Sequence, residues 1–203
     1  MYRDCKSPVP DQLIYPCKSE YMILGIAGTI GAGKGTVVEY LKTKGFAHYS
    51  SSGVLGEIAV ERGIEPARSN LSQLANELMA DHEGGVLFFS HKRALEAGHK
   101  DYILESLHRV SEGEYIKSIG GIILGVDADV RSRYDRAIAR KEGMKDDVTF
   151  EQFLADSERE DDGKTGSGPN IKAVIKMADY TIMNDGTMEE LQKAVDEFIQ
   201  KFL

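Results

Sequence analysis

A glycine-rich segment with one lysine, GTIGAGKGT at residues 28–36, has the residue types and spacing of a phosphate-binding loop. It follows an apolar run at residues 21–27 and leads into a stretch of helical composition. A strand that ends in such a turn and opens into a helix points backbone N–H groups and the positive end of the helix dipole at one spot. The glycines allow φ > 0 and let a phosphate approach the main chain. We therefore expect Lys34 to reach the β and γ phosphates of a bound nucleotide.

The elements that must position this loop are predicted by apolar runs that alternate with amphipathic stretches. The runs are continuous rather than alternating, which is typical of strands buried on both faces of a parallel sheet with helices between them. A doubly wound α/β domain, with its ligand at the carboxyl ends of the strands, is the architecture that this order predicts. Strands are expected at 21–27, 46–50, 102–105, 121–126 and 180–183, and helices at 34–44, 54–61, 69–79, 86–96, 128–140, 150–161 and 188–202.

Length, composition and charge limit the kind of protein. A chain of 203 residues suits one domain, which we place at 21–203, after an irregular N-terminal extension at 1–20 that holds three of the five prolines and both cysteines. The net charge of −8 argues against a nucleic-acid or membrane-surface binder. No apolar run is long enough for a membrane span, and residues 1–20 have no apolar signal-peptide core. We expect a cytoplasmic protein, monomeric or homodimeric.

The loop also resembles a known family. The form GxxGxGKGT beginning at Gly28 is similar to the P-loop of nucleoside monophosphate kinases of the adenylate kinase type. The segment ADYTIMN at residues 178–184 resembles the closing motif of small kinases related to adenylate kinase and dephospho-CoA kinase, including uncharacterised archaeal-type proteins. The resemblance implies a P-loop NTPase fold of three layers, α/β/α, with strand order 2-3-1-4-5. It also implies an acceptor-binding region at about 51–98 and a short helical lid at about 133–163.

ATP and Mg²⁺ are the cofactors that the resemblance implies. The ATP-binding residues carried over from it are Gly28, Gly31, Ala32, Gly33, Lys34, Gly35 and Thr36. One position departs from the usual pattern GxxxxGK[ST], because Gly35 follows the lysine and Thr36 comes one residue later. We expect Thr36 to help hold Mg²⁺ or the adjacent phosphates.

Arg133, Arg136 and Arg140 are spaced three and four apart, so they share one face of a helix. On charge pattern alone they could be a solvated basic edge, paired with acids such as Asp129 and Asp135. The family resemblance, however, implies that this helix leads into the lid whose arginines grip the transferred phosphate. Arg136 and Arg140 are then the first candidates, followed by Arg133 and, on the returning helix, Arg159.

The acceptor side is predicted from two further motifs. ESLHR at residues 105–109 resembles the family motif DGxxR, which assigns Arg109 to the acceptor phosphate and Glu105 to ordering Mg²⁺ through water. SSSG at residues 50–53 resembles an STGD-type turn, which makes Ser52 and Gly53 acceptor-binding residues. The arginine that would follow this turn is replaced by Gly56. Arg68 is its substitute, or else an ordinary exposed arginine at the start of a helix.

These observations leave three hypotheses open. The first is transfer of the γ-phosphate of ATP to a nucleoside or deoxynucleoside monophosphate. The second is phosphorylation of a hydroxyl group, as in dephospho-CoA kinase, where Glu105 would be the obvious general base. The third is a nucleotide-binding regulatory module with little turnover, a hypothesis that the weakened acceptor motifs motivate.

Overall fold

The computed structural model describes residues 22–140, 148–161 and 170–202 of the chain. Its centre is a sheet of five parallel strands in the order β2-β3-β1-β4-β5, so the predicted strand order is confirmed. Because β1 lies between β3 and β4, the loop that follows β1 lies between the carboxyl ends of two other strands. The strands are β1 (Met22–Gly28), β2 (Ala47–Ser50), β3 (Asp101–Leu107), β4 (Ile122–Asp127) and β5 (Tyr180–Met183).

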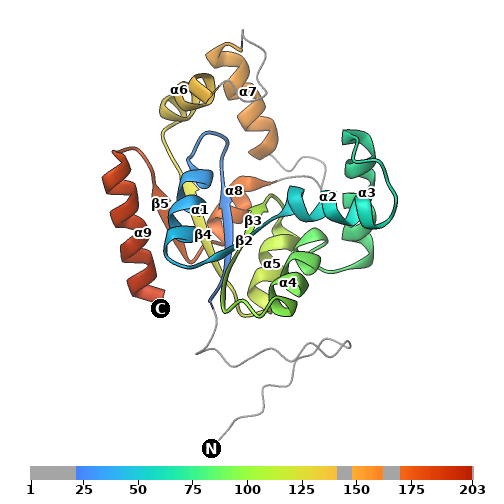
Figure 1. The fold of residues 1–203 in the computed structure, drawn as a ribbon. Helices are drawn as coiled ribbons and strands as arrows, with labels where there is room; N and C mark the ends of the chain where they lie inside the picture. Colours follow the sequence, from blue (N-terminus) through green and yellow to red (C-terminus); the bar gives the residue numbers. More distant parts are fainter. Residues whose placement is uncertain (1–21, 141–147, 162–169, 203) are drawn as a thin grey trace, which may run out of the picture.

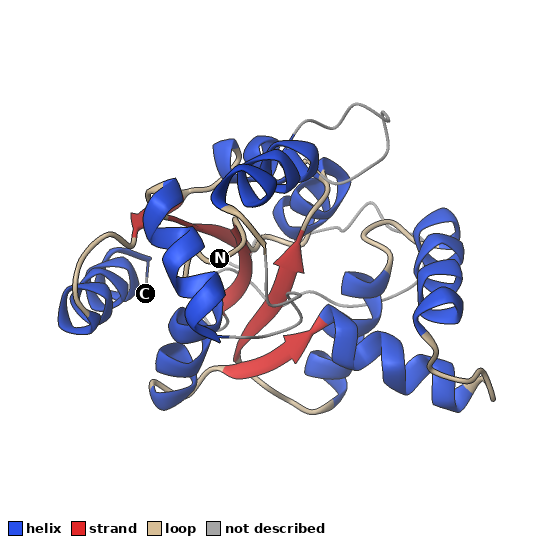
Figure 2. Ribbon diagram, turned by 90° about the horizontal axis from the view of Figure 1, so that it is seen from above, coloured by secondary structure: helices blue, strands red, loops and turns tan. Residues whose placement is uncertain are grey.

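Helices cover both faces of this sheet (Figure 1 and Figure 2). Helices α1 and α9 pack together on one face, and α4, α5 and α8 lie on the other. Helices α2 and α3 pack beside α4, whereas α6 and α7 pair beyond the carboxyl ends of the strands (Figure 1). The bounds are α1 (Lys34–Thr43), α2 (Ser51–Glu61), α3 (Arg68–Asp81), α4 (Val86–Glu96), α5 (Val110–Ser118), α6 (Val130–Arg140), α7 (Phe150–Asp161), α8 (Ile171–Lys176) and α9 (Met188–Phe202).

The sheet separates two apolar cores. Successive residues of a strand point to opposite faces, so Leu24 and Ile26 of β1 join the core under α1 and α9, whereas Ala27 joins the core under α4, α5 and α8. All three side chains are fully buried. Burial on both faces is what the continuous apolar runs predicted. A third, smaller cluster holds α2 and α3 against α4.

Two helices of the structure were not predicted. Helix α5 contains Gly113, and glycine lowers helix propensity. Glycine fits at this position because a Cβ would press against Met177. Helix α8 has six residues, too few for a helical period to be recognised. Helix α2 also begins at Ser51, three residues before its predicted start, because the Ser50 hydroxyl accepts a hydrogen bond from Gly53 N.

Candidate functional site

The loop between β1 and α1 has the backbone that its glycines predicted. Gly31 and Gly33 have φ of 77° and 97°, in the left-handed region that side chains with a Cβ rarely adopt. A Cβ would also overlap the carbonyl oxygen of Arg133 at Gly31 and that of Val126 at Gly28. The ammonium group of Lys34 donates to Gly28 O at 2.7 Å and to Thr29 O at 3.1 Å, so its charge lies against the loop. This geometry is suited to an anion at the N-terminus of α1.

A carboxylate at the end of β4 supports the same loop. Asp127 Oδ1 accepts a hydrogen bond from the Thr29 hydroxyl at 2.7 Å and another from Ala128 N at 2.9 Å. Asp127 therefore joins the loop after β1 to the chain that leads into α6. Sequence reasoning missed this residue, although its place directly after the apolar run of β4 was a usable signal.

Asn184, directly after β5, is a second residue that sequence reasoning missed. Its side-chain Nδ2 donates to Ala32 O at 2.8 Å, and its main-chain N donates to Asp127 O at 2.7 Å. Its carbonyl oxygen accepts a hydrogen bond from Arg136 Nη2 at 2.7 Å. The motif ADYTIMN contains Asn184, and this was the signal that could have found it.

The predicted lid arginines differ in their surroundings. Arg133 is 8% exposed, its Nε donates to Ala128 O at 3.2 Å, and its guanidinium lies 5.9 Å from the centre of the Phe153 ring of α7. Arg136 binds the Asn184 carbonyl, and its Nη1 is buried with no hydrogen-bond partner among the described residues. The side chains of Arg140 and Arg159 lie outside the described part of the chain. Their predicted contacts with phosphate stay predictions.

On the side predicted to bind the acceptor, Glu105 at the end of β3 pairs with the imidazole of His48 on β2. Glu105 Oε2 lies 2.7 Å from His48 Nε2, across the β2–β3 pair. The hydrogen bond from His48, with the nearby charges of Lys34 and His108, lowers the pKa of Glu105 against an opposing effect of burial. The next residue, Ser106, has φ of 77°, in the place where the DGxxR motif has glycine. Sequence reasoning assigned His48 no role.

Arg109 lies at the N-terminal cap of α5. The main-chain N–H groups of His108 and Arg109 donate to Glu112 Oε2 at 2.7 and 3.0 Å. Burial raises the pKa of Glu112, and these two hydrogen bonds oppose that shift. Desolvation, with the charges of Lys34 and Arg109, lowers the pKa of His108. The capping interaction fixes the start of α5 and with it the base of the Arg109 side chain.

The remaining residues predicted to bind the acceptor lie on α2 and α3. Ser52 and Gly53 are exposed in the first turn of α2, and Arg68 is exposed at the first residue of α3. Arg93, by contrast, is held by ion pairs to Glu57 and Glu61 of α2, so it ties α4 to α2. No described contact brings Arg68 to Arg109.

Comparisons with known proteins agree with this geometry. A family model described as an AAA domain matches residues 24–165. The chain belongs to this AAA domain family. The match runs from β1 through the P-loop to α6 and α7, so it includes the segments that carry the predicted nucleotide and acceptor residues.

Among curated relatives of this AAA-family chain is a UPF0200 protein of Hyperthermus butylicus, 27% identical over 89% of this chain and 94% of that protein. UPF0200 proteins of Thermococcus kodakarensis and Sulfurisphaera tokodaii are each 29% identical over 89% of this chain, and they are covered over 100% and 97% of their length.

Solved structures share the fold. The structure of TT1252 from Thermus thermophilus has a TM-score of 0.57 and 21% identity, and the match covers 91% of this chain and 99% of that one. Shikimate kinase from Bacteroides thetaiotaomicron has a TM-score of 0.52 and 12% identity, covering 88% and 98%. The AAA-family chain therefore has the fold of P-loop kinases. Among the described helices, none is long and apolar enough to cross a bilayer.

The chemistry of the available side chains fits Mg²⁺ bound together with a nucleotide. Mg²⁺ takes oxygen ligands and is held by one or two carboxylates, substrate phosphates and water. The described residues of this AAA-family chain contain no group of three or more His, Cys, Asp or Glu side chains that could hold a metal alone. Thr36, in the first turn of α1, and Glu105, in the strand beside β1, supply one hydroxyl and one carboxylate on the P-loop side of the sheet.

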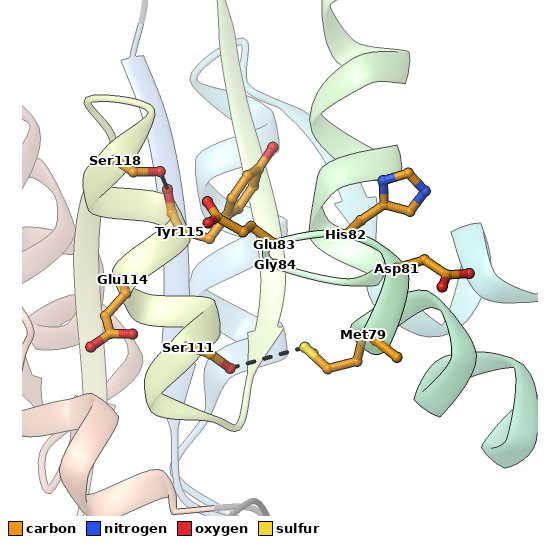
Figure 3. A pocket seen from close by; sticks show the side chains of 10 residues that line it. Met79, Asp81, His82, Glu83, Gly84, Ser111, Glu114, Tyr115 and Ser118 are labelled. Atoms are coloured by element: carbon orange, nitrogen blue, oxygen red, sulfur yellow. Dashed lines mark hydrogen bonds between the residues drawn. The ribbon is translucent and has the colours of Figure 1, made fainter. Parts of the chain in front are cut away.

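A separate hollow of about 470 Å³ lies between the α3–α4 turn and α5 (Figure 3). Asp81, Glu83 and Glu114 give it an acidic lining, and the Tyr115 ring packs against Gly84. Residues 79–84 of its lining fall within the predicted acceptor-binding region, but none of the individual residues predicted to bind nucleotide or acceptor lines it. The candidate site of this AAA-family chain is therefore at the carboxyl ends of β1, β3 and β4, and not in this hollow.

Proposed function

We propose that the chain is an ATP-dependent phosphotransferase whose acceptor is a nucleoside or deoxynucleoside monophosphate. The observation that carries the proposal is the P-loop with Lys34 against it and the Arg136 guanidinium tied beside it through Asn184. Positive charge from two side chains and the N-terminus of α1 is thereby gathered where a triphosphate would lie. Phosphoryl transfer needs this arrangement, because its transition state spreads negative charge over the transferred group.

In the proposed step, the bond from the γ-phosphorus to the β,γ-bridging oxygen breaks, and a bond to an acceptor phosphate oxygen forms. ADP leaves with the electron pair of the broken bond. The acceptor oxygen is already ionised near neutral pH, so the step needs no general base. Lys34 and Arg136 stabilise the charge on the transferring group, and Arg109 holds the acceptor phosphate. Mg²⁺, held by Thr36 and Glu105, would neutralise charge on the β and γ phosphates.

The test is an ATP-consumption screen with Mg²⁺ against all ribo- and deoxynucleoside monophosphates, dephospho-CoA and shikimate. Shikimate is included because shikimate kinases are among the structural neighbours. Lys34→Ala is the blank, and Lys42→Ala, an exposed lysine of the same helix paired with Glu39, is the matched control. Activity on a monophosphate that Lys34→Ala loses and Lys42→Ala keeps would establish the proposal. If none of the monophosphates in the panel supports ATP consumption, the proposal is contradicted.

A second candidate function, phosphorylation of a hydroxyl group, is favoured by the Glu105–His48 hydrogen bond. The Glu105 carboxylate, held in place by the His48 imidazole, can take the proton of an attacking hydroxyl group. Glu105→Gln distinguishes the two functions. It should abolish hydroxyl phosphorylation at every Mg²⁺ concentration, whereas transfer to a monophosphate should be altered chiefly in its Mg²⁺ dependence.

The regulatory alternative is decided by a single-turnover assay with protein in excess over γ-labelled ATP. Transfer of label to any acceptor rules out a module without turnover. Tight nucleotide binding with no transfer to any acceptor would support the module and end the kinase proposal.

A further inference from the structure

Asn184 is the point where three parts of the site meet. Its side chain contacts the top of the P-loop at Ala32, and its main chain contacts the end of β4 at Asp127 and the lid helix α6 at Arg136. These three partners are distant in sequence and belong to different elements. Asn184 therefore joins the P-loop to α6, in addition to the contact that Arg133 of α6 makes with Ile30 O.

The surroundings of Asn184 leave it little freedom. The residue is 7% exposed, and its Nδ2 lies so close to Gly33 that a Cβ on the glycine would overlap it. A buried amide that loses its acceptor bears the full cost of desolvation, so the side chain is held in the orientation that donates to Ala32 O. Asn184 thereby contacts both the P-loop at Ala32 and the guanidinium of Arg136.

Only one of the two terminal nitrogens of Arg136 has a hydrogen-bond partner among the described residues. Nη2 donates to the Asn184 carbonyl, whereas Nη1 is buried and has no hydrogen-bond partner among the described residues. Buried polar groups are nearly always paired, so this donor is available to a bound anion such as a phosphate. Both Nη atoms are bonded to the same carbon, so fixing Nη2 at the Asn184 carbonyl also fixes the position of Nη1.

We infer that Asn184 is a positioning residue, which sets Arg136 against the P-loop so that Nη1 can donate to a phosphate of the bound nucleotide. Asn184 acts through Arg136 and Ala32 and does not itself contact the reacting atoms. This inference rests on the proposed function for the identity of the anion. It adds to that function a residue that joins nucleotide binding at the P-loop to the position of the lid helix.

The test is a double-mutant cycle on binding of a non-hydrolysable ATP analogue with Mg²⁺, measured by calorimetry. The four proteins are the natural chain, Asn184→Ala, Arg136→Met and the double variant. Asn184→Ala removes the contact with Ala32 O but keeps the carbonyl that binds Arg136, so it tests whether the side-chain contact sets the position of that carbonyl. We expect each single change to weaken binding about tenfold and the double change to weaken it no further, because residues that act as one unit are not additive. Asn184→Ser, which keeps a hydroxyl donor, should recover part of the affinity, and it replaces Asn184→Ala in the cycle if the alanine variant does not fold.

The control for a merely structural effect is Asp179→Asn at the opposite end of β5. Asp179 accepts a hydrogen bond from Ile123 N at 2.8 Å and pairs with Lys117, so its loss destabilises the same strand away from the P-loop. Equal weakening in Asp179→Asn, additive losses in the double variant, or unchanged binding in Arg136→Met would each overturn the inference. Binding needs no acceptor, so the cycle gives its answer even if the acceptor screen finds no activity and the proposed function fails.

Discussion

The glycines of the P-loop and of helix α1 with its C-terminal turn differ in what constrains them. Gly31 has positive φ and faces the main chain of Arg133, whereas Gly45, after α1, has φ of 99° and open space around the position of a Cβ. Gly35 lies in the first turn of α1 with neither constraint. Gly31 thus has both backbone strain and steric overlap, Gly45 has backbone strain alone, and Gly35 has neither.

Alanine substitutions at these positions should rank accordingly. Gly45→Ala should lose about 1 kcal/mol of unfolding free energy from backbone strain alone. Gly31→Ala should lose clearly more, because the Arg133 carbonyl cannot move aside without moving α6. Gly35→Ala should be neutral or stabilising by up to about 1 kcal/mol, since alanine is the better helix residue. Urea denaturation of the nucleotide-free protein measures all three, and equal losses at Gly31 and Gly45 would contradict the role of the overlap.

Ser106 presents the opposite case, a side chain where the backbone favours glycine. Its φ of 77° lies at the register shift between β1 and β3, next to Glu105. Ser106→Gly should relieve a strain of roughly 1–2 kcal/mol but add freedom to the unfolded chain, for a net gain of about 0.5–1 kcal/mol. The same change at Ser111, inside α5, should instead be destabilising, because glycine is a poor helix residue. Thermal denaturation of the two variants should therefore show shifts of opposite sign, and a shift in the same direction would refute the strain.

At the scale of elements, the apolar runs predicted all five strands. The strands β1, β3 and β4 are buried on both faces, as continuous runs predict. The edge strands differ, because β2 is only partly buried and one face of β5, with Thr181 and Met183, is exposed. The P-loop was predictable because its glycines and lysine are adjacent in sequence. The contacts of Asp127, Asn184 and His48 were not, because they join strand ends whose proximity depends on the order and register of the sheet. Helix α8 was not predicted because its six residues are too few to show a helical period. Its stability depends instead on its N-cap and its packing.

That dependence of α8 can be measured at Asn170. The Asn170 side chain accepts a hydrogen bond from Ala173 N at 3.0 Å, and its main-chain N donates to His108 O at 2.7 Å. Asn170→Ala should therefore cost about 1 kcal/mol of stability, the usual value for an N-cap. Asn170→Asp should retain most of the stability, because aspartate caps a helix as well as asparagine does. Comparable losses in both variants by urea denaturation would show that the cap is not what stabilises α8.

Across the whole molecule, the two cores on either side of the sheet differ in their polar content. The core under α4, α5 and α8 surrounds His91, which is 0% exposed and hydrogen-bonded through Nδ1 to the Tyr102 hydroxyl at 2.7 Å. Tyr115 of α5 also faces the imidazole ring. Burial lowers the pKa of His91 to about 4, from 6.5 in a model peptide. The charged form of His91 thus opposes folding of this core.

The stability of the whole protein should therefore fall as the pH is lowered through this window. Above pH 6.5 His91 is neutral in both states; between pH 6.5 and about 4 the unfolded state binds a proton that the native state does not. From pH 7 to pH 5 this difference amounts to about 2 kcal/mol of unfolding free energy. His91→Gln removes the titration, so the natural chain should lose about 2 kcal/mol more than this variant over the same interval. Replacing the exposed His99 with glutamine controls for the removal of a histidine as such. Parallel pH profiles of the natural chain and His91→Gln in urea denaturation would show that His91 is not the group that links this core to pH.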